Sequence, residues 1–354
     1  MTTQSIRIGI IGVGFGSKVH IPGFQSEGFE VVAVCSQRRD RADKAAKEFG
    51  IPTAYTDYRK MLSHPGLEAV SIVTPPNLHY EMALAAFEAG KHVFCEKPLA
   101  MNQQQAKEMW EKSRKAGLTG MVTHEFRFTP ARAYMKELLT QGYIGTMRNV
   151  SITMFIAGRQ GRDPSDWRTR YSQGGGQLGG IGSHYIDCLR DWFGEITGVG
   201  GRVFPPDSSP GSAGDDADNA FSLLLTFANG GWGSLTASFV APFGSGVRIE
   251  VYGSEGALSA PHPGFNPPAV GNVFGAQLAK TKQMEELPIP ERFRLISDDR
   301  DPRLGAFRTL LQRFRQGIAE GTSPAPNLYD GYRCQQVIDA GLEATTSGRW
   351  ILIP

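Results

Sequence analysis

The chain has 354 residues, of which 40% are hydrophobic and 20% are charged, and its net charge at pH 7 is +2. This composition is typical of a folded globular protein and excludes disordered and fibrous classes, while the near-neutral charge gives no electrostatic basis for binding nucleic acid. Because single cores stop growing at roughly 250–300 residues, we expect two domains.

Signals for export and for membranes are missing from the sequence. The N-terminal residues lack the basic and apolar regions of a secretory signal, and no apolar run approaches the ~20 residues of a transmembrane helix. The four cysteines are widely spaced and form no C-x-x-C motif. We therefore expect buried thiols in a cytoplasmic protein, with neither a disulfide nor a metal site. The cysteines are Cys35, Cys95, Cys188 and Cys334.

The stretch 7–16, RIGIIGVGFG, predicts a strand that is buried on both faces and ends in a glycine turn. Gly12 and Gly14 are separated by one residue, which lets the backbone approach a pyrophosphate, and a following helix would point N–H groups at the phosphates. The third small position of the G-x-G-x-x-G pattern falls on Ser17, so the match is imperfect. A glycine-rich turn without a ligand is the alternative. The expected dinucleotide contacts here are Gly12, Gly14, Phe15 and Gly16.

The next predicted strand, Phe29–Cys35, ends in residues that bear on the choice of cofactor. In NAD sites an acidic residue at this point binds the ribose 2′-hydroxyl, whereas NADP sites carry a small polar residue and arginines instead. Here Ser36 occupies that position, and Arg38 and Arg39 follow it. This pattern favours NADP(H) over NAD(H). The alternative is that Arg38, Arg39 and Arg41 are only the solvated start of a helix.

Strands and helices alternate as far as residue 123. Predicted helices cover 40–49, 57–62, 78–89 and 102–116, and predicted strands cover 53–56, 68–74, 92–95 and 120–123. Asn77 is the expected N-cap of the third helix. This rhythm implies right-handed crossovers and a parallel doubly wound sheet, whose ligands bind beyond the carboxyl ends of the strands. Further expected cofactor contacts at these ends are Thr74, Pro75, Pro76, Asn77, His79, Glu96 and Lys97.

From residue 146 the pattern changes to β-rich runs that are separated by Gly, Asn and Pro turns. These runs predict an open, largely antiparallel sheet with helices on one face, including a helix at 303–320. The dipeptide Asn229-Gly230 predicts a hairpin, and the polar stretches 205–218 and 261–301 are predicted to be loops. The predicted strands cover 146–157, 198–204, 220–227, 231–240 and 247–252.

A glycine-rich segment at 174–194 carries candidate catalytic side chains. If it is helical from about Gly180, then Gly180, His184, Asp187 and Asp191 lie on one face, opposite an apolar face. A polar helix face is often only solvated surface, and that interpretation remains open. A histidine beside a glycine loop favours a functional site, because its unperturbed pKa of ~6.5 suits proton transfer.

Residues 74–100, TPPNLHYEMALAAFEAGKHVFCEKPLA, resemble the signature of the glucose-fructose oxidoreductase, inositol dehydrogenase and rhizopine-catabolism (Gfo/Idh/MocA) family of NAD(P)-dependent oxidoreductases. The E-K-P tripeptide after a G-K-H-V strand is specific to that family among dinucleotide folds, and the similarity extends to the C-terminal residues 326–354. The resemblance implies a Rossmann domain at 1–124 and an α+β domain at 125–354 for substrate binding and oligomerisation. It allows the C-terminal segment to pack back on the first domain, and it implies a homodimer or homotetramer formed through the second sheet.

The resemblance also implies catalytic roles. The family's lysine and histidine match Lys97 and His184, and its later acid matches Asp187. We assign His184 as the general acid/base and Lys97 as the group that polarises the substrate oxygen, and the reverse assignment remains open. The family's first acid falls on Gly180, a departure that leaves its work to Asp187, another residue or water. The bond between Lys97 and Pro98 is expected to be cis.

The segment 124–130, HEFRFTP, is similar to the family's junction between the two domains. The similarity implies that Arg127 is a structural ion-pair donor between domains. It also implies that His124, which stands where family members usually carry Asn, lines the substrate site. His79 is expected to be either a structural residue or one close to the cofactor.

Aromatic residues before the glycine loop are candidates for a carbohydrate pocket, in which Trp167 and Tyr171 would offer ring faces beside Arg168 and Arg170. The alternative is that Trp167 belongs to the core. Together the motifs predict an NADP(H)-preferring oxidoreductase that transfers a hydride between nicotinamide and a sugar, cyclic polyol or related hydroxy/keto compound. Two other functions remain open: a non-catalytic nicotinamide-binding regulator, which Gly180 favours, and a reductase of a non-sugar carbonyl or imine. No nucleic acid or membrane partner is expected.

Overall fold

The computed structural model describes residues 5–158, 166–204, 215–263, 271–296 and 298–354. The chain divides into two compact units, which we call unit 1 and unit 2. Unit 1 is formed by Met1–Thr123 with Ser297–Gln335, and unit 2 is formed by His124–Ile296 with Gln336–Pro354. The C-terminal part of the chain is therefore shared between the two units.

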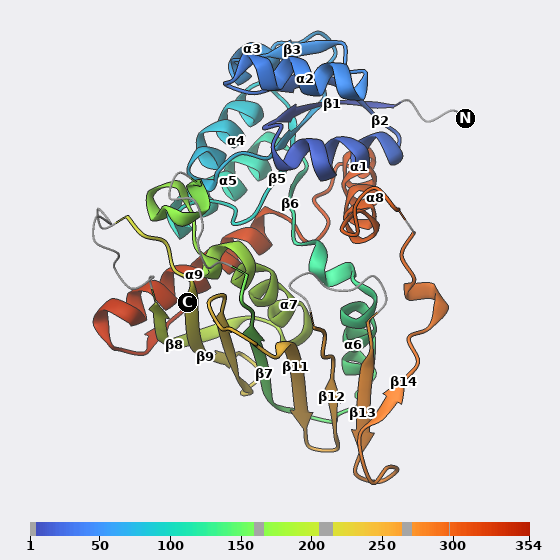
Figure 1. Ribbon diagram of the computed structural model, residues 1–354, viewed down its shortest axis with the longest axis vertical. Helices are drawn as coiled ribbons and strands as arrows, with labels where there is room; N and C mark the ends of the chain where they lie inside the picture. The colour runs from blue at the N-terminus through green and yellow to red at the C-terminus, as the bar shows by residue number, and fades with distance from the viewer. Residues whose placement is uncertain (1–4, 159–165, 205–214, 264–270, 297) are drawn as a thin grey trace. The chain divides into compact units, whose positions relative to one another are not determined.

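Unit 1 contains a six-stranded parallel sheet in the order β3-β2-β1-β4-β5-β6 (Figure 1). Its central strands consist largely of Ile, Val and Ala, and Ile8, Ile10 and Val70 are completely buried, because helices cover both faces. The predicted doubly wound parallel sheet is confirmed. The strands are β1 (Ile6–Ile11), β2 (Phe29–Cys35), β3 (Thr53–Tyr55), β4 (Ala69–Ile72), β5 (His92–Cys95) and β6 (Gly120–Val122).

The helices of unit 1 begin and end largely where their capping residues predict. Gly50 ends α2 in the left-handed conformation, and the side chains of Asp57 and Asn102 cap α3 and α5. The predicted cap at Asn77 is wrong, because a 3₁₀ turn at Pro76–Leu78 precedes α4 and no side chain caps that helix. The helices are α1 (Ile21–Ser26), which continues a π-helical turn at Gly16–His20, α2 (Arg39–Phe49), α3 (Tyr58–Leu62), α4 (His79–Glu88), α5 (Gln103–Ala116) and α8 (Leu304–Glu320).

Helix α8 packs beside α1 although nearly 300 residues separate them in sequence (Figure 1). Phe307 and Phe314 of α8 contact Phe94 of β5, with ring centroids 5.7 and 5.2 Å apart. Phe24 of α1 joins the same cluster at 5.5 Å from Phe94. A cluster of large aromatic rings buries much apolar surface, so the segment Ser297–Gln335 is an integral part of the core of unit 1.

Unit 2 contains a nine-stranded sheet in the order β14-β13-β12-β11-β7-β10-β9-β8-β15. All neighbouring strands are antiparallel except β10 and β7, which are parallel. The predicted largely antiparallel sheet is confirmed, and Asn229-Gly230 connects β9 and β10 as a hairpin. The strands are β7 (Met147–Phe155), β8 (Ile196–Phe204), β9 (Ala220–Phe227), β10 (Trp232–Ser238), β11 (Gly246–Gly253), β12 (Gly256–Ser259), β13 (Val273–Gln277), β14 (Glu285–Leu287) and β15 (Ile351–Leu352).

One face of this sheet is buried against helices, and the other carries small polar side chains together with exposed apolar ones such as Leu224 and Trp232. Phe221 and Leu223 of β9 are buried and contact the helical segments around Gly182 and Gly341, whereas their neighbour Leu224 is 52% exposed. The alternation along each strand thus separates a core face from an outer face. The helices of unit 2 are α6 (Pro130–Thr140), α7 (Ser183–Phe193) and the end of α9 (Leu328–Ser347), within which the boundary between the units falls.

The prediction of a loop at 261–301 is wrong, because β13 and β14 lie within it. These strands are short and poor in β-branched residues, so pairing with β12 rather than local propensity accounts for them. In the predicted loop 205–218, Asp216 forms an isolated β-bridge with Arg170. Residues 205–214, 264–270 and 297 of the two predicted loops lie outside the described residues.

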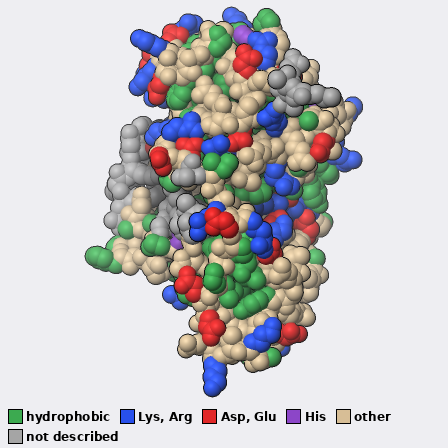
Figure 2. Space-filling view, turned by 90° about the vertical axis from the view of Figure 1, so that its right-hand side faces the viewer, with side chains coloured by type: hydrophobic (Ala, Val, Ile, Leu, Met, Phe, Trp, Pro, Cys, Tyr) green, Lys and Arg blue, Asp and Glu red, His purple; other side chains and the backbone are tan. Residues whose placement is uncertain are grey.

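Figure 2 shows basic and acidic side chains interspersed over one face of the molecule, without a large field of either sign. In the described ranges, no helix is long and apolar enough to cross a membrane. All four cysteines are buried, as the sequence predicts. Burial, together with the nearby charge of Asp57, raises the pKa of Cys35 to about 12, so this thiol stays protonated.

Candidate active site

The glycine turn after β1 has a backbone that other residues rarely adopt. Gly12 has a φ of +102°, and a Cβ there would lie 2.4 Å from the carbonyl oxygen of Val73. The Gly12 amide donates a hydrogen bond to the carbonyl oxygen of Cys35 at 2.8 Å, which holds the turn against the end of β2. At Gly14, in contrast, a Cβ would meet no described atom within 4 Å. A tight turn followed by open backbone fits the approach of a pyrophosphate.

Phe15 and Gly16 lead from this turn into the π-helical turn Gly16–His20. The guanidinium of Arg303, just before α8, lies over the Phe15 ring at 4.8 Å from its centroid, and it also donates to Asp301 at 2.7 Å. A residue from the far end of the chain therefore borders the glycine turn. Sequence analysis missed Arg303, because no local pattern connects residues so far apart.

The polar residues expected at the carboxyl ends of the strands lie along one edge of the sheet, since parallel strands all end on the same side. The strand order reverses between β1 and β4, and such switch points are where open α/β sheets bind ligands. The residues along this edge are Gly12 after β1, Ser36 after β2, Thr74, Pro75, Pro76 and Asn77 after β4, and Glu96 and Lys97 after β5.

The arginines after β2 are exposed and paired with carboxylates. Arg38 donates to Asp40 at 2.7 Å and Arg39 donates to Asp43 at 2.8 Å, and the two arginine side chains are 60% and 66% exposed. The Ser36 hydroxyl oxygen accepts a hydrogen bond from the Arg38 amide at 3.3 Å. Helix α2 begins at Arg39, so the geometry is compatible both with a phosphate site and with a solvated helix start.

His79 is completely buried at the start of α4. Its two ring nitrogens lie 3.0 Å from the carbonyl oxygen of Pro98 and 2.9 Å from that of Thr74, so the side chain ties the end of β4 to the segment after β5. Burial lowers the pKa of His79, and the two carbonyl oxygens oppose this shift, because only a protonated ring can donate to both of them. The geometry gives His79 a structural role beside the strand ends.

Lys97 follows β5 and is held through its backbone. Its amide donates to Glu96 Oε2 and to Thr123 Oγ1, at 3.2 Å in each case, and the bond to Pro98 is cis, as the sequence resemblance implies. Burial alone would raise the pKa of the Glu96 carboxyl, but a hydrogen bond from His20 and the charges of His20 and Lys97 bring it below the usual range. Glu96 is therefore an ionised carboxylate next to Lys97.

His20 is a site residue that sequence analysis missed. It ends the π-helical turn after the glycines, is fully buried, and lies 2.9 Å from Glu96 and 2.8 Å from the Ser71 hydroxyl. A signal was present in the sequence, because His20 is a polar residue within the apolar run Val19 to Ile21, directly after a candidate cofactor turn.

In unit 2, Arg127 binds the acids of α7. Its Nε and Nη2 donate to the two carboxylate oxygens of Asp187, both at 2.5 Å, and its Nη1 donates to Asp191 at 3.0 Å. Lys136 of α6 also donates to Asp191, at 2.6 Å. Arg127 thus forms ion pairs, as predicted, and these two acids belong to its own unit. Asp187 and Arg127 are buried, so the polar face of α7 is not solvated surface.

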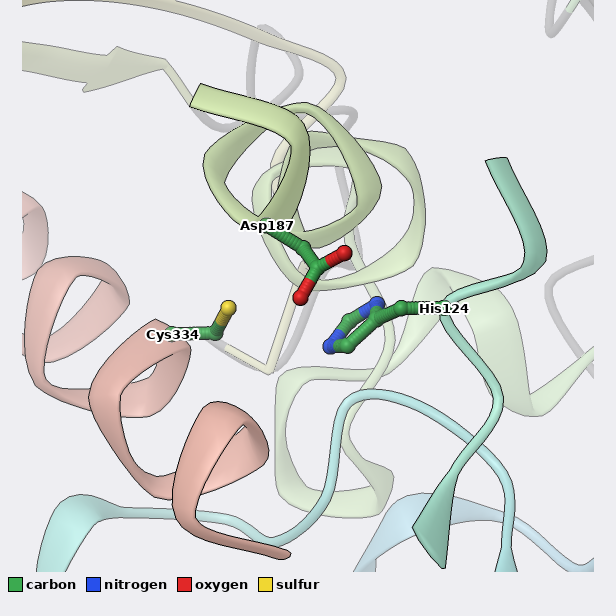
Figure 3. Close-up of side chains that lie close together, drawn as sticks. All are labelled: His124, Asp187 and Cys334. Atoms are coloured by element: carbon green, nitrogen blue, oxygen red, sulfur yellow. The ribbon is translucent and has the colours of Figure 1, made fainter. Parts of the chain in front are cut away.

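His184, one turn before Asp187 on α7, is buried among aromatic rings. Its ring stacks on Phe126, with the centroids 3.9 Å apart and the planes 8° apart, and His124 meets it edge-on at 5.6 Å. Its Nδ1 lies 3.9 Å from a carboxylate oxygen of Glu125. Figure 3 shows the His124 ring and the Asp187 carboxylate pointing toward one another. Both Asp187 oxygens accept from Arg127, so this carboxylate serves the guanidinium rather than a metal ion.

The helix that carries His184 starts differently from the prediction. A π-helical turn at Leu178–Gly182 precedes α7, and Asp218 accepts hydrogen bonds from the amides of Gln177 and Leu178, both at 2.9 Å. Gly176 has a φ of +112°, and a Cβ there would lie 2.1 Å from Asp218 Oδ1. Asp218 therefore anchors the glycine loop, a role that sequence analysis missed. A Cβ at Gly180 would meet no described atom within 4 Å.

The candidate carbohydrate residues lie in short 3₁₀ turns before the glycine loop. Trp167 is partly exposed, with the Arg168 guanidinium 5.6 Å from its ring centroid, so it does not belong to the core. Tyr171 is 50% exposed. Partial burial and the charges of Asp339 and Asp218 raise the pKa of Tyr171, so its hydroxyl stays protonated.

The structure thus assembles two groups of predicted residues. In unit 1, the glycine turn, Ser36, the segment from Thr74 to Asn77, and Glu96 with Lys97 share one edge of the sheet. In unit 2, His184 lies beside His124, and Asp187 is bound to Arg127. Lys97 belongs to the first group and His184 to the second.

Two family models match the chain. Residues 6–124 match a model described as "Oxidoreductase family, NAD-binding Rossmann fold", and residues 133–259 match a model described as "GFO/IDH/MocA C-terminal domain". The two matches fall in the two groups of strands described above.

Relatives that cover most or all of the chain agree with these matches. The chain is 31% identical to scyllo-inositol 2-dehydrogenase (NAD(+)) of Bacillus subtilis, over 72% of this chain and 73% of the relative. It is 28% identical to D-xylose 1-dehydrogenase (NADP(+)) 2 of Haloferax volcanii, over 97% and 98%. Among solved structures, levoglucosan dehydrogenase in complex with NADH and levoglucosan superposes with a TM-score of 0.88 at 27% identity, covering 99% of this chain and 100% of that one.

Proposed function

Because the chain belongs to the GFO/IDH/MocA oxidoreductase family, whose first domain is an NAD-binding Rossmann fold, we propose that it is an NADP(H)-preferring dehydrogenase of a sugar, cyclic polyol or related hydroxy/keto compound. The observation that carries the proposal is the edge of the unit 1 sheet, where the Gly12 turn and the Glu96-Lys97 pair both lie. The glycine turn fits a dinucleotide, and the lysine supplies a proton donor at the same edge.

The surroundings of Ser36 support the preference for NADP(H). No carboxylate stands at the end of β2, where one would repel a 2′-phosphate. The two arginines that follow form exposed ion pairs, which contribute little to stability and exchange readily for a phosphate. Arg38 and Arg39 can therefore exchange their carboxylate partners for the dianionic 2′-phosphate with little loss of free energy.

In the proposed reaction the alcohol carbon loses a hydride and its oxygen loses a proton, which yields a carbonyl, and the reverse reaction adds both. The nicotinamide, when bound, accepts or supplies the hydride. Lys97 polarises the substrate oxygen, and His184 takes or gives the proton at that oxygen. Asp187 acts through Arg127 as a positioning residue, because their two hydrogen bonds fix α7 and hence the direction of His184.

Relatives and exposed aromatic rings support a carbohydrate-like substrate. The three relatives are named for inositol, xylose and levoglucosan, all of which are polyhydroxy compounds. Trp167 and Tyr171 are accessible, as ring faces that bind sugar C–H groups must be. His124, beside His184, completes the proposed substrate contacts. A non-catalytic regulator of the same fold is the second candidate, and the missing family acid at Gly180 is the observation that favours it.

The outer face of the unit 2 sheet supports assembly into a homodimer or homotetramer. Leu224 and Trp232, on adjacent strands of that face, are each 52% exposed, and their cross-strand partners are the small side chains of Ser234 and Thr226. Apolar side chains on a broad sheet are typical of surfaces that a second copy covers. The four free, buried thiols support a cytoplasmic location.

The proposal is tested by following NADP⁺ and NAD⁺ reduction at 340 nm by the purified full chain with a panel of aldoses, inositols and anhydrosugars. Lys97→Met should lower kcat by about 10²–10⁴-fold on the best substrate while cofactor affinity stays near that of the wild type, because only the group that polarises the substrate oxygen is lost. Lys91→Met is the matched control, since Lys91 only donates to the Leu67 carbonyl oxygen at 2.8 Å, at the opposite end of β5.

Each outcome of this experiment has a defined meaning. Turnover that survives in Lys97→Met would reject the role of Lys97. Tight cofactor binding without turnover of any panel member would favour the regulator. A preference for NAD⁺ would reject the assignment of NADP(H).

A further inference from the structure

We propose that His20 is a positioning residue that fixes Glu96 and, through it, the backbone of Lys97, so that the lysine meets its substrate at the correct place. The inference rests on the proposed function of Lys97, and it concerns a residue that no motif in the sequence singled out. The imidazole of His20 thus serves to position the catalytic lysine rather than to bind the cofactor.

The geometry places His20 between two neighbouring strands at the switch point of the sheet. Its Nδ1 lies 2.8 Å from the hydroxyl of Ser71 on β4, and its Nε2 lies 2.9 Å from Glu96 Oε1, directly after β5. The imidazole has no exposed surface, whereas the Glu96 side chain retains 13%. A buried imidazole whose two nitrogens both have partners is held in one orientation.

The partners also determine the tautomer of His20. The pKa of Glu96 is below its usual range, so its carboxylate is ionised at neutral pH and can only accept hydrogen bonds. The Nε2 of His20 must then carry the proton and donate it to Glu96. Nδ1 then accepts from the Ser71 hydroxyl when it carries no proton and donates to the Ser71 oxygen when it carries one, so the contact holds the ring in either case. Ser71 therefore orients the ring so that its N–H points at Glu96.

Glu96, held in place by His20, in turn holds the backbone of Lys97. One carboxylate oxygen accepts from His20, and the other accepts from the amide of Lys97 at 3.2 Å. Thr123 Oγ1 accepts from the same amide at 3.2 Å, so the backbone of Lys97 is held from two sides. Displacing a catalytic group by about 1 Å can cost about 10²-fold in rate, which is why such a restraint matters.

The competing explanation is that His20 only fills space among aromatic rings. Its ring lies 4.6 Å from that of Phe307 and 6.0 Å from that of Phe94, in the cluster that joins α8 to the sheet. Two substitutions separate the explanations. His20→Phe keeps an aromatic ring in the cluster and removes both nitrogens, whereas His20→Gln loses the ring and keeps a side-chain amide that can donate to Glu96.

The test measures kcat, the dissociation constant of NADPH and the thermal midpoint of the purified full chain and its variants. We expect His20→Phe to lower kcat by about 10- to 100-fold, with the NADPH dissociation constant within about twofold of the wild type. His20→Gln should recover most of the kcat despite a lower thermal midpoint. His92→Phe is the matched control, because the Nδ1 of His92 only accepts from the Thr119 amide at 3.0 Å, at the opposite end of β5.

A second readout does not depend on turnover. The pKa of the Glu96 carboxyl is followed by ¹³C NMR with labelled glutamate, and Glu96→Gln identifies its resonance. His20, Lys97 and Thr123 lower the pKa of Glu96, and the titratable groups His79 and Cys95 also interact with it electrostatically. His20→Phe leaves the other four groups in place, so it should raise this pKa, and His92→Phe should leave it unchanged.

Several results would overturn the inference. An unchanged pKa of Glu96 in His20→Phe would do so, as would an unchanged kcat in an active enzyme, or a variant His20→Gln no better than His20→Phe. Absence of turnover in the wild type would instead reject the proposed function, and the Glu96 titration would then decide the inference alone.

Discussion

Each unit contains a buried carboxylate at its candidate site, and the two carboxylates have different partners. Glu96 in unit 1 is held by a histidine, a backbone amide and the charge of a neighbouring lysine. Asp187 in unit 2 is held by both arms of the Arg127 guanidinium. A histidine can gain or lose a proton, so the hydrogen bonds around Glu96 can change with protonation. An arginine stays charged, so the hydrogen bonds around Asp187 do not change in this way.

Because the two carboxylates have different partners, burial of an acid does not by itself identify a catalytic group. The helical spacing predicts that Asp187 lies on the same face of the helix as His184, in a position that would suit a proton acceptor. The partner decides the role, because an acid whose two oxygens are both bound by one arginine serves to hold a helix in place. The following predictions test this contrast, beginning with the largest expected effect.

Asp187→Asn should destabilise the protein by about 3–5 kcal/mol, because it leaves the buried Arg127 without the partner that its fork fits. Asp191→Asn should cost only about 0.5–1.5 kcal/mol, since Arg127 keeps both bonds to Asp187. Chemical denaturation of both variants measures the difference. Equal losses of stability in the two variants would mean that Arg127 depends on the total negative charge of the two acids and not on its specific hydrogen bonds to Asp187.

Ser36→Asp tests whether the carboxyl edge of unit 1 discriminates cofactors by charge. We expect the ratio of kcat/KM for NADP⁺ to that for NAD⁺ to fall by about 10- to 100-fold, because a carboxylate would repel the 2′-phosphate and bind the ribose hydroxyl instead. Ser63→Asp, which adds the same charge at an exposed position after α3, is the control. A ratio that moves equally in both variants would show that only the overall charge matters.

Gly180→Ala should stabilise unit 2 by roughly 0.4–1 kcal/mol, because alanine restricts the unfolded chain and its Cβ meets no described atom within 4 Å. Gly176→Ala should destabilise it, since its φ is positive and its Cβ would collide with Asp218. Thermal unfolding of the two variants compares them. Destabilisation by both would show that the space at Gly180 is needed by the π-helical turn.

Sequence reasoning was most successful where structure is local. The strands of unit 1 and the predicted helix boundaries at Gly50 and Asp57 are confirmed, because apolar runs and capping residues act over a few residues. The cap at Asn77 is wrong, since the two preceding prolines lead into a 3₁₀ turn. The short strands β13 and β14 were missed, because their pairing partners rather than their residues make them strands.

The parallel sheet, its glycine turn and the E-K-P segment could be predicted from the amino-acid sequence, since periodicity, turn residues and motifs are local properties of the chain. Three long-range features emerge only in the folded molecule: His20 contacts Glu96 across 76 residues, Arg127 contacts Asp187 across 60, and α8 belongs to unit 1. Such pairings depend on which surfaces the folded core brings together. No local pattern of hydrophobicity or charge encodes that choice, because many partners would satisfy each side chain equally well.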